Sequence, residues 1–189
     1  MRNFQPVTKS ILIQLTAVVS PINISTAKAE RELRSHDMSH HEPSLSEVVV
    51  WPSSSQQTAD VLRIAHENHI PVTPWGVGSS LEGNPIPLFG GILLSMEKMD
   101  SIVTVHEEDF QVTVQAGLCY KDLNEKLSRY GLFFAPDPGA NATIGGMLAN
   151  NAAGSRTVKY GATKDNVLAM EVALADGRLI KGFFRISWG

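Results

Sequence analysis

The sequence predicts an α+β fold of two small α/β subdomains, with ligand-binding loops between them. Three observations support this prediction. Residues 47–74 have the pattern of a strand, a helix and a second extended segment. Residues 91–116 contain three short strand-like runs in succession. Two glycine-rich loops, residues 74–84 and 136–146, each follow an extended segment, as ligand-binding loops commonly do.

The first half of the chain begins with an amphipathic helical pattern. Residues 11–19 place their apolar side chains on one face and are too few to span a bilayer. The β-branched run Glu47–Trp51 predicts a strand. Ser54 and Gln57 have the spacing of a capping box, which predicts a helix from there to about His69.

The second half is richer in predicted strands. Asp122–Tyr130 predicts a helix closed by Gly131. Val167–Ala175 and Arg178–Lys181 predict a β-hairpin. Three more strands are predicted before them: Gly91–Met96, Ile102–His106 and Gln111–Ala116.

Composition excludes several classes of partner. The formal net charge is −3 and no Lys/Arg run is present, which argues against nucleic acid and acidic membrane surfaces. We expect no transmembrane segment. The single cysteine, Cys119, excludes an internal disulfide and fits a reducing compartment. We therefore expect a cytoplasmic protein, with peripheral membrane association as the alternative.

The first glycine-rich loop matches neither of two common phosphate-binding motifs. Gly76 and Gly78 are followed by Leu81 where a dinucleotide fingerprint needs its third glycine. Gly83 has the P-loop spacing from Gly78, but Asn84 stands where that motif needs lysine. What remains is a loop whose own amides and the hydroxyls of two serines bind phosphate, or an ordinary surface turn.

The second loop leads into a predicted helix. Thr143 is a plausible N-cap, and residues 144–153 form a short helical pattern ending before Gly154. Gly145 and Gly146 in the first turn are poor helix formers. Two explanations remain open: a ligand close to free N–H groups at the helix N-terminus, or a tight helix-on-sheet contact that leaves no room for a side chain.

The remaining candidate residues do not form a recognisable catalytic set. We predict no metal site, because the tract with His36, His40 and His41 reads as a solvated segment. His66 and His69 read as surface residues of a helix. No paired carboxylates and no Cys-His or Ser-His-Asp arrangement can be identified from spacing.

The order of these segments resembles the flavin-binding domain of the vanillyl-alcohol oxidase and p-cresol methylhydroxylase family, and within it the D-lactate dehydrogenase and glycolate oxidase D-subunit branch. The resemblance implies a PCMH-type FAD-binding fold that holds FAD between two subdomains. It also implies hydride transfer from a D-2-hydroxy acid (D-lactate or glycolate) to flavin, and an electron-acceptor protein or quinone. The matching segments are Val48–Pro52, Pro71–Gly83, Asp137–Gly146, Asn150–Gly154, Tyr160–Gly161, Asp165–Leu168 and Leu174–Gly177.

The resemblance assigns a role to each loop. The first would hold the pyrophosphate and ribityl region, and the second would line the isoalloxazine and adenosine sides. We expect non-covalent FAD, because relatives tether flavin through histidine and neither loop contains His or Cys. The expected cofactor-binding residues are Pro74, Trp75, Gly76, Val77, Gly78, Ser79, Ser80, Leu81, Pro138, Gly139, Thr143, Gly145, Gly146, Asn151 and Gly154.

The expected organisation is an N-terminal helix and connector (1–42), the FAD-binding domain (43–181) and an atypical tail (182–189). The tail departs from the family pattern, which suggests a truncated chain whose catalytic residues lie beyond position 189. Two alternatives stay open. One is a non-catalytic flavin-binding fragment, and the other is a family member acting on another substrate, such as an alditol oxidase or a cell-wall-precursor enolpyruvate reductase.

Overall fold

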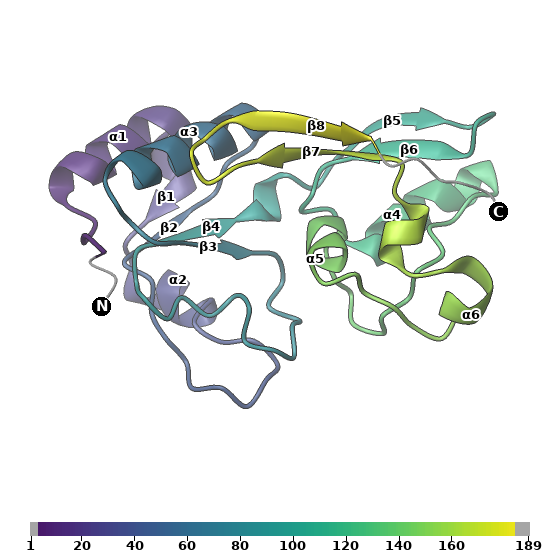
Figure 1. Ribbon diagram of the computed structural model, residues 1–189, viewed down its shortest axis with the longest axis horizontal. Helices are drawn as coiled ribbons and strands as arrows, with labels where there is room; N and C mark the ends of the chain where they lie inside the picture. The colour runs from purple at the N-terminus through teal and green to yellow at the C-terminus, as the bar shows by residue number, and fades with distance from the viewer. Residues whose placement is uncertain (1–3, 184–189) are drawn as a thin grey trace. The chain divides into compact units, whose positions relative to one another are not determined.

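The computed structural model describes residues 4–183, which form two compact units (Figure 1). The first unit contains the described residues up to Lys98 together with Glu171–Lys181. The second contains Met99–Met170 and the described residues from Gly182. Most of the tail that we expected to be atypical, residues 184–189, lies outside the described residues.

A four-stranded sheet organises the first unit. Its order is β1-β2-β4-β3, with β1 (Ile24–Ser25) antiparallel to β2 (Val48–Val50). Both β2 and β3 (Val72–Trp75) pair in parallel with β4 (Ile92–Ser95). Central parallel strands are buried on both faces, which explains why β2 and β4 consist almost entirely of apolar residues.

Helices cover both faces of this sheet. α1 (Lys9–Val19) and α3 (Ser55–Glu67) lie together on one face, with α2 (Lys28–Leu33) on the other (Figure 1). The α1 and α3 face forms the main core, which includes Leu15, Val48, Val61 and Ile92. The short η1 (Pro21–Asn23) precedes β1, and η2 (Met96–Lys98) follows β4.

The second unit is built on a two-stranded antiparallel sheet of β5 (Ile102–His106) and β6 (Gln111–Val114). The buried face of α4 (Tyr120–Leu127) packs against this sheet through Leu123 and Leu127. Four short helical segments complete the unit: η3 (Ser128–Tyr130), α5 (Ile144–Ala149), α6 (Thr157–Tyr160) and η4 (Thr163–Asn166).

A hairpin of β7 (Ala169–Ala173) and β8 (Leu179–Phe183) ends the described chain. Its turn contains Gly177, whose φ is +83° and whose Cα approaches α3 so closely that a Cβ would lie 2.7 Å from the Ala59 carbonyl oxygen. The α+β prediction is confirmed, as are the predicted strands, α1, α3 and the hairpin. The prediction missed β1 and α2.

Candidate cofactor-binding loops

The first loop leaves the sheet where its parallel strands end. β2, β3 and β4 run in the same direction, so their carboxyl ends meet at one edge. β3 ends at Trp75, whose buried side chain packs with Val49, Trp51 and Leu93. Ligands of open parallel sheets commonly bind beyond the carboxyl ends of the strands. Residues 76–84 therefore start from a position that suits a ligand-binding loop.

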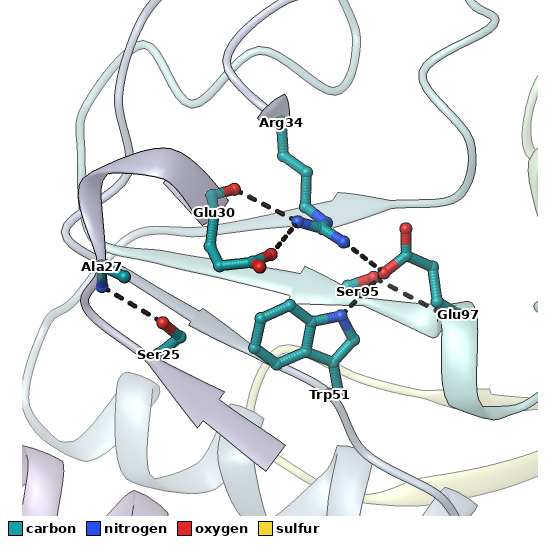
Figure 2. Close-up of polar contacts among 7 residues, drawn as sticks. All are labelled: Ser25, Ala27, Glu30, Arg34, Trp51, Ser95 and Glu97. Carbon is teal, nitrogen blue, oxygen red and sulfur yellow. Dashed lines mark hydrogen bonds and ion pairs between the residues drawn. The ribbon is translucent and has the colours of Figure 1, made fainter. Parts of the chain in front are cut away.

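An ion network around the buried side chain of Arg34 fixes this edge of the sheet (Figure 2). The Arg34 guanidinium donates to Glu30 Oε2 at 2.6 Å and to Glu97 Oε2 at 2.7 Å. Trp51 Nε1 donates to the same Glu97 oxygen at 2.7 Å, and the guanidinium lies 5.0 Å from the Trp51 ring. A buried cation needs such partners. The network thereby ties α2 to the residues that follow β2 and β4.

The amides of the first loop lack protein partners. In the described part of the chain, the main-chain N–H groups of Val77, Gly78, Ser79, Ser80 and Leu81 donate to no protein acceptor. Five such donors in succession are the main feature of an anion-binding concavity. Of the two serines, Ser80 accepts a hydrogen bond from the Glu82 N–H at 3.2 Å through its hydroxyl.

Two glycines shape this loop by close approach and positive φ. Gly78 has φ +66°, and a Cβ there would lie 2.7 Å from the Trp75 ring. Gly83 has φ +76°, and its N–H donates to Asp37 Oδ2 at 2.8 Å. Burial tends to raise the pKa of Asp37, but hydrogen bonds from Ser39 and Gly83 outweigh it and lower that pKa. The prediction did not include Asp37 among the site residues.

The second loop is organised around Asp137. Tyr120 donates its phenolic hydrogen to Asp137 Oδ1 at 2.8 Å, and the Gly139 N–H donates to the same oxygen at 3.2 Å. Burial, together with the hydrogen bond to Asp137, raises the pKa of Tyr120 to about 12. The same hydrogen bond lowers the pKa of Asp137. Pro138 and Gly139 are thus held next to a carboxylate, and Gly139 has open space around its Cα.

Thr143 is the N-cap of α5, as predicted, and its hydroxyl accepts from the Gly146 N–H at 3.2 Å. The expectation of free N–H groups at this helix is wrong. The Ile144 N–H donates to the Leu118 carbonyl and the Gly145 N–H donates to the Ala116 carbonyl, both at 2.8 Å. A Cβ on Gly145 would lie 2.8 Å from the Ala116 Cβ. Of the two explanations left open, the tight contact is confirmed for Gly145.

The end of α5 also differs from the prediction. The helix ends at Ala149, and Asn151 takes the positive φ of +47° that helix ends require. The Asn151 side-chain oxygen accepts from the Lys164 N–H at 3.0 Å. Gly154 lies further on, where a Cβ would stand 1.5 Å from the Asp137 carbonyl oxygen. Gly154 is therefore a packing glycine for the 136–139 segment and not the helix terminator.

The other candidates stay outside these loops or take no chemical role. Among the described residues, no group of three or more His, Cys, Asp and Glu side chains could hold a metal ion. His66 and His69 are exposed, as predicted. Burial, with the nearby Asp122 carboxylate, raises the pKa of Cys119, which disfavours a reactive thiolate.

The predicted residues therefore fall into two groups, each within one unit. Pro74 to Leu81 lie together at the end of β3, and the remainder surround Asp137 and α5. The five unpaired amides suit the pyrophosphate of a dinucleotide, which would accept hydrogen bonds from them. These residues fit a nucleotide cofactor, although their assignment to it remains a prediction.

The chain is similar to a known domain family and to several curated proteins. Residues 46–182 match the model of the FAD binding domain family. A probable mitochondrial D-lactate dehydrogenase of Danio rerio is 39% identical over 170 residues, covering 90% of this chain and 34% of that protein. Glycolate oxidase subunit GlcD of Bacillus subtilis is 34% identical over 177 residues, covering 93% of this chain and 38% of that protein. This chain spans about a third of the length of these relatives.

A solved structure shows the same fold. The crystal structure of p-cresol methylhydroxylase with substrate bound has a TM-score of 0.78 at 21% identity, covering 95% of this chain and 37% of that one. Among the described residues, no helix is both long enough and apolar enough to cross a bilayer. The family match covers more than half of the sequence, so the chain belongs to the FAD binding domain family, has the PCMH-type fold and uses FAD as its cofactor.

Proposed function

We propose that this chain is the FAD-binding part of an oxidoreductase that oxidises a D-2-hydroxy acid, with D-lactate and glycolate as the candidate substrates. Family membership supports the cofactor, and the names of the relatives support the substrate class. The single structural observation that carries the proposal is the run of five unpaired amides from Val77 to Leu81.

The two loops would divide the cofactor between them. Residues 74–81 would hold the pyrophosphate and ribityl region through main-chain N–H groups. The second group would line the isoalloxazine and adenosine sides. Within it, Pro138 and Gly139 are the best placed for direct contact, because Gly139 has open space around it. Thr143, Gly145, Gly146, Asn151 and Gly154 would act mainly by shaping the backbone, since their amides or close contacts are already used within the protein.

Bound FAD would supply the hydride-accepting chemistry, while the protein supplies binding, orientation and exclusion of water. The chain spans about a third of the length of the relatives named above, so we expect it alone to bind FAD weakly and not to oxidise the acid. The electron acceptor in the intact enzyme would be a protein or a quinone, and the compartment would be the cytoplasm.

The cofactor would be held without a covalent bond. Residues 74–84 and 136–154 contain neither His nor Cys. Acid precipitation of the flavin-loaded protein should leave a colourless pellet and a yellow supernatant. A pellet that stays yellow after washing would point to a covalent bond, with Cys119 or a histidine outside these loops as the residue to test.

An anaerobic absorption spectrum tests the function. Purified chain loaded with FAD is mixed with D-lactate, glycolate or an alditol, and the flavin band is followed. We expect a flavin spectrum without bleaching for the chain alone, and bleaching by D-lactate or glycolate once a C-terminal segment of the family type is added. Bleaching by the alditol only would favour the other-substrate alternative, and no bleaching in either form would favour the non-catalytic one.

A further inference from the structure

Residues 36–41 lie between α2 and β2 in sequence and contact the first loop. Their sequence is polar, and most of these side chains are exposed. Asp37 is the exception, with only 7% of its surface exposed. A nearly buried carboxylate in an otherwise solvated segment requires hydrogen-bond donors, which the protein must supply.

Both oxygens of Asp37 are satisfied by such donors. Oδ2 accepts from the Gly83 N–H at 2.8 Å, and Oδ1 accepts from the Ser39 N–H at 2.9 Å and from the Ser39 hydroxyl. One carboxylate therefore joins the 36–41 segment to the far end of the first loop. The sequence separation of 46 residues between Asp37 and Gly83 makes this a long-range connection.

A further hydrogen bond fastens the middle of the same loop. The Met38 N–H donates to the Ser80 carbonyl oxygen at 3.0 Å. This bond uses a carbonyl of residues 77–81, while the five N–H groups of that run stay without protein acceptors.

We propose that Asp37 is a positioning residue for the cofactor phosphate, which fixes the first loop in the conformation that presents the amides of residues 77–81. This inference rests on the proposed function, in which those amides receive the pyrophosphate. Asp37 would not touch the cofactor, because its oxygens are occupied by Ser39 and Gly83.

The direction in which FAD affinity changes when Asp37 is neutralised distinguishes a positioning role from direct electrostatic repulsion. A carboxylate near an anion repels it, so removing the charge would tighten FAD binding if charge alone mattered. If Asp37 positions the loop, the same substitution would weaken FAD binding. In Asp37→Asn one oxygen becomes an NH₂ donor that faces another N–H, so either the Ser39 or the Gly83 connection is lost.

The test measures the affinities of the full 189-residue chain for FAD and for riboflavin, by quenching of flavin fluorescence. Riboflavin lacks the pyrophosphate, so it reports general damage to the protein without reporting the phosphate loop. We expect Asp37→Asn to weaken FAD binding about tenfold and riboflavin binding less than twofold. Ser39→Ala, which keeps the bond to Gly83, should give a smaller loss with the same selectivity. Asp60→Asn is the matched control, since it removes a hydrogen-bonded carboxylate from α3 of the same unit.

The outcomes distinguish a failure of the phosphate role of the first loop from a failure of the positioning role of Asp37. If the unmodified chain binds FAD no better than riboflavin, the phosphate role of the first loop is wrong. If it prefers FAD and Asp37→Asn binds FAD equally or more tightly, the positioning role of Asp37 is wrong. Equal losses for both flavins in Asp37→Asn would also overturn it, as a general structural effect. Should Asp37→Asn fail to fold, an unchanged FAD preference in Ser39→Ala would overturn the inference.

Discussion

The two glycine-rich loops share a sequence pattern and differ in how their backbones are used. In the first, five successive amides from Val77 to Leu81 have no protein acceptor, and the segment around Asp37 holds the loop from outside. In the second, the amides of Ile144, Gly145 and Gly146 are all occupied within the protein. The first loop thus leaves its amides free of protein acceptors, whereas in the second loop the amides are used within the protein and glycine allows two segments to pack closely.

The largest effect is expected at Gly154, where packing is tightest. A Cβ in Gly154→Ala would stand 1.5 Å from the Asp137 carbonyl oxygen, so the backbone of the second loop must move. We expect the free energy of unfolding to fall by about 3 kcal/mol or more, measured by urea denaturation. Gly131→Ala is the control, because no atom lies within 4 Å of the position that a Cβ would take there, and its positive φ of +67° alone should cost about 1 kcal/mol. Similar costs for both variants would contradict the packing role.

A smaller loss of stability is expected at Gly145. In Gly145→Ala the new methyl group would meet Ala116 at 2.8 Å, and we expect a cost of about 1–3 kcal/mol in urea denaturation. Any loss of FAD should follow the loss of folded protein. If Gly145→Ala remains as stable as the unmodified chain yet no longer retains flavin, the glycine contacts the cofactor directly and the contrast between the loops is weaker than we describe.

Tyr120→Phe tests the anchor of the second loop. Losing the hydrogen bond to Asp137 should cost about 1 kcal/mol near neutral pH. The raised pKa of Tyr120, about 12, means that its contribution is complete below its ordinary value near 10 and is lost as the pH rises toward 12. The stability of the unmodified chain should therefore fall across this alkaline range more steeply than that of Tyr120→Phe. Parallel pH profiles would be evidence against the anchor.

Ser79→Ala is expected to have the smallest effect. No protein partner occupies the Ser79 hydroxyl among the described residues, whereas its amide is available for the phosphate. We expect FAD affinity to fall about threefold, with the free energy of unfolding changed by less than about 0.5 kcal/mol. Thr104→Val, which removes an exposed hydroxyl from β5, should leave FAD affinity unchanged. A tenfold loss in Ser79→Ala would mean that the side chain and not the amides dominates phosphate binding.

The local patterns predicted much of this structure. The capping signal at Ser54 begins α3, Gly131 closes the α4 and η3 segment in a left-handed conformation, and Thr143 caps α5. Local patterns did not reveal β1, because two residues are too few to form a pattern and their pairing with β2 is tertiary. The distinction between the loops was also hidden, since it depends on carbonyls at Ala116 and Leu118 that are distant in sequence. Asp37 was missed for the same reason.

Assigned amide resonances in a ¹H–¹⁵N NMR titration with inorganic pyrophosphate test the contrast most directly. An anion that accepts a hydrogen bond shifts the resonance of the donating amide, so each loop reports separately. We expect the saturable shifts to concentrate at Val77–Leu81, with little change at Ile144–Gly146. Shifts centred on Ile144–Gly146, or none at Val77–Leu81 at saturating pyrophosphate, would contradict the assignment of the phosphate site to the first loop.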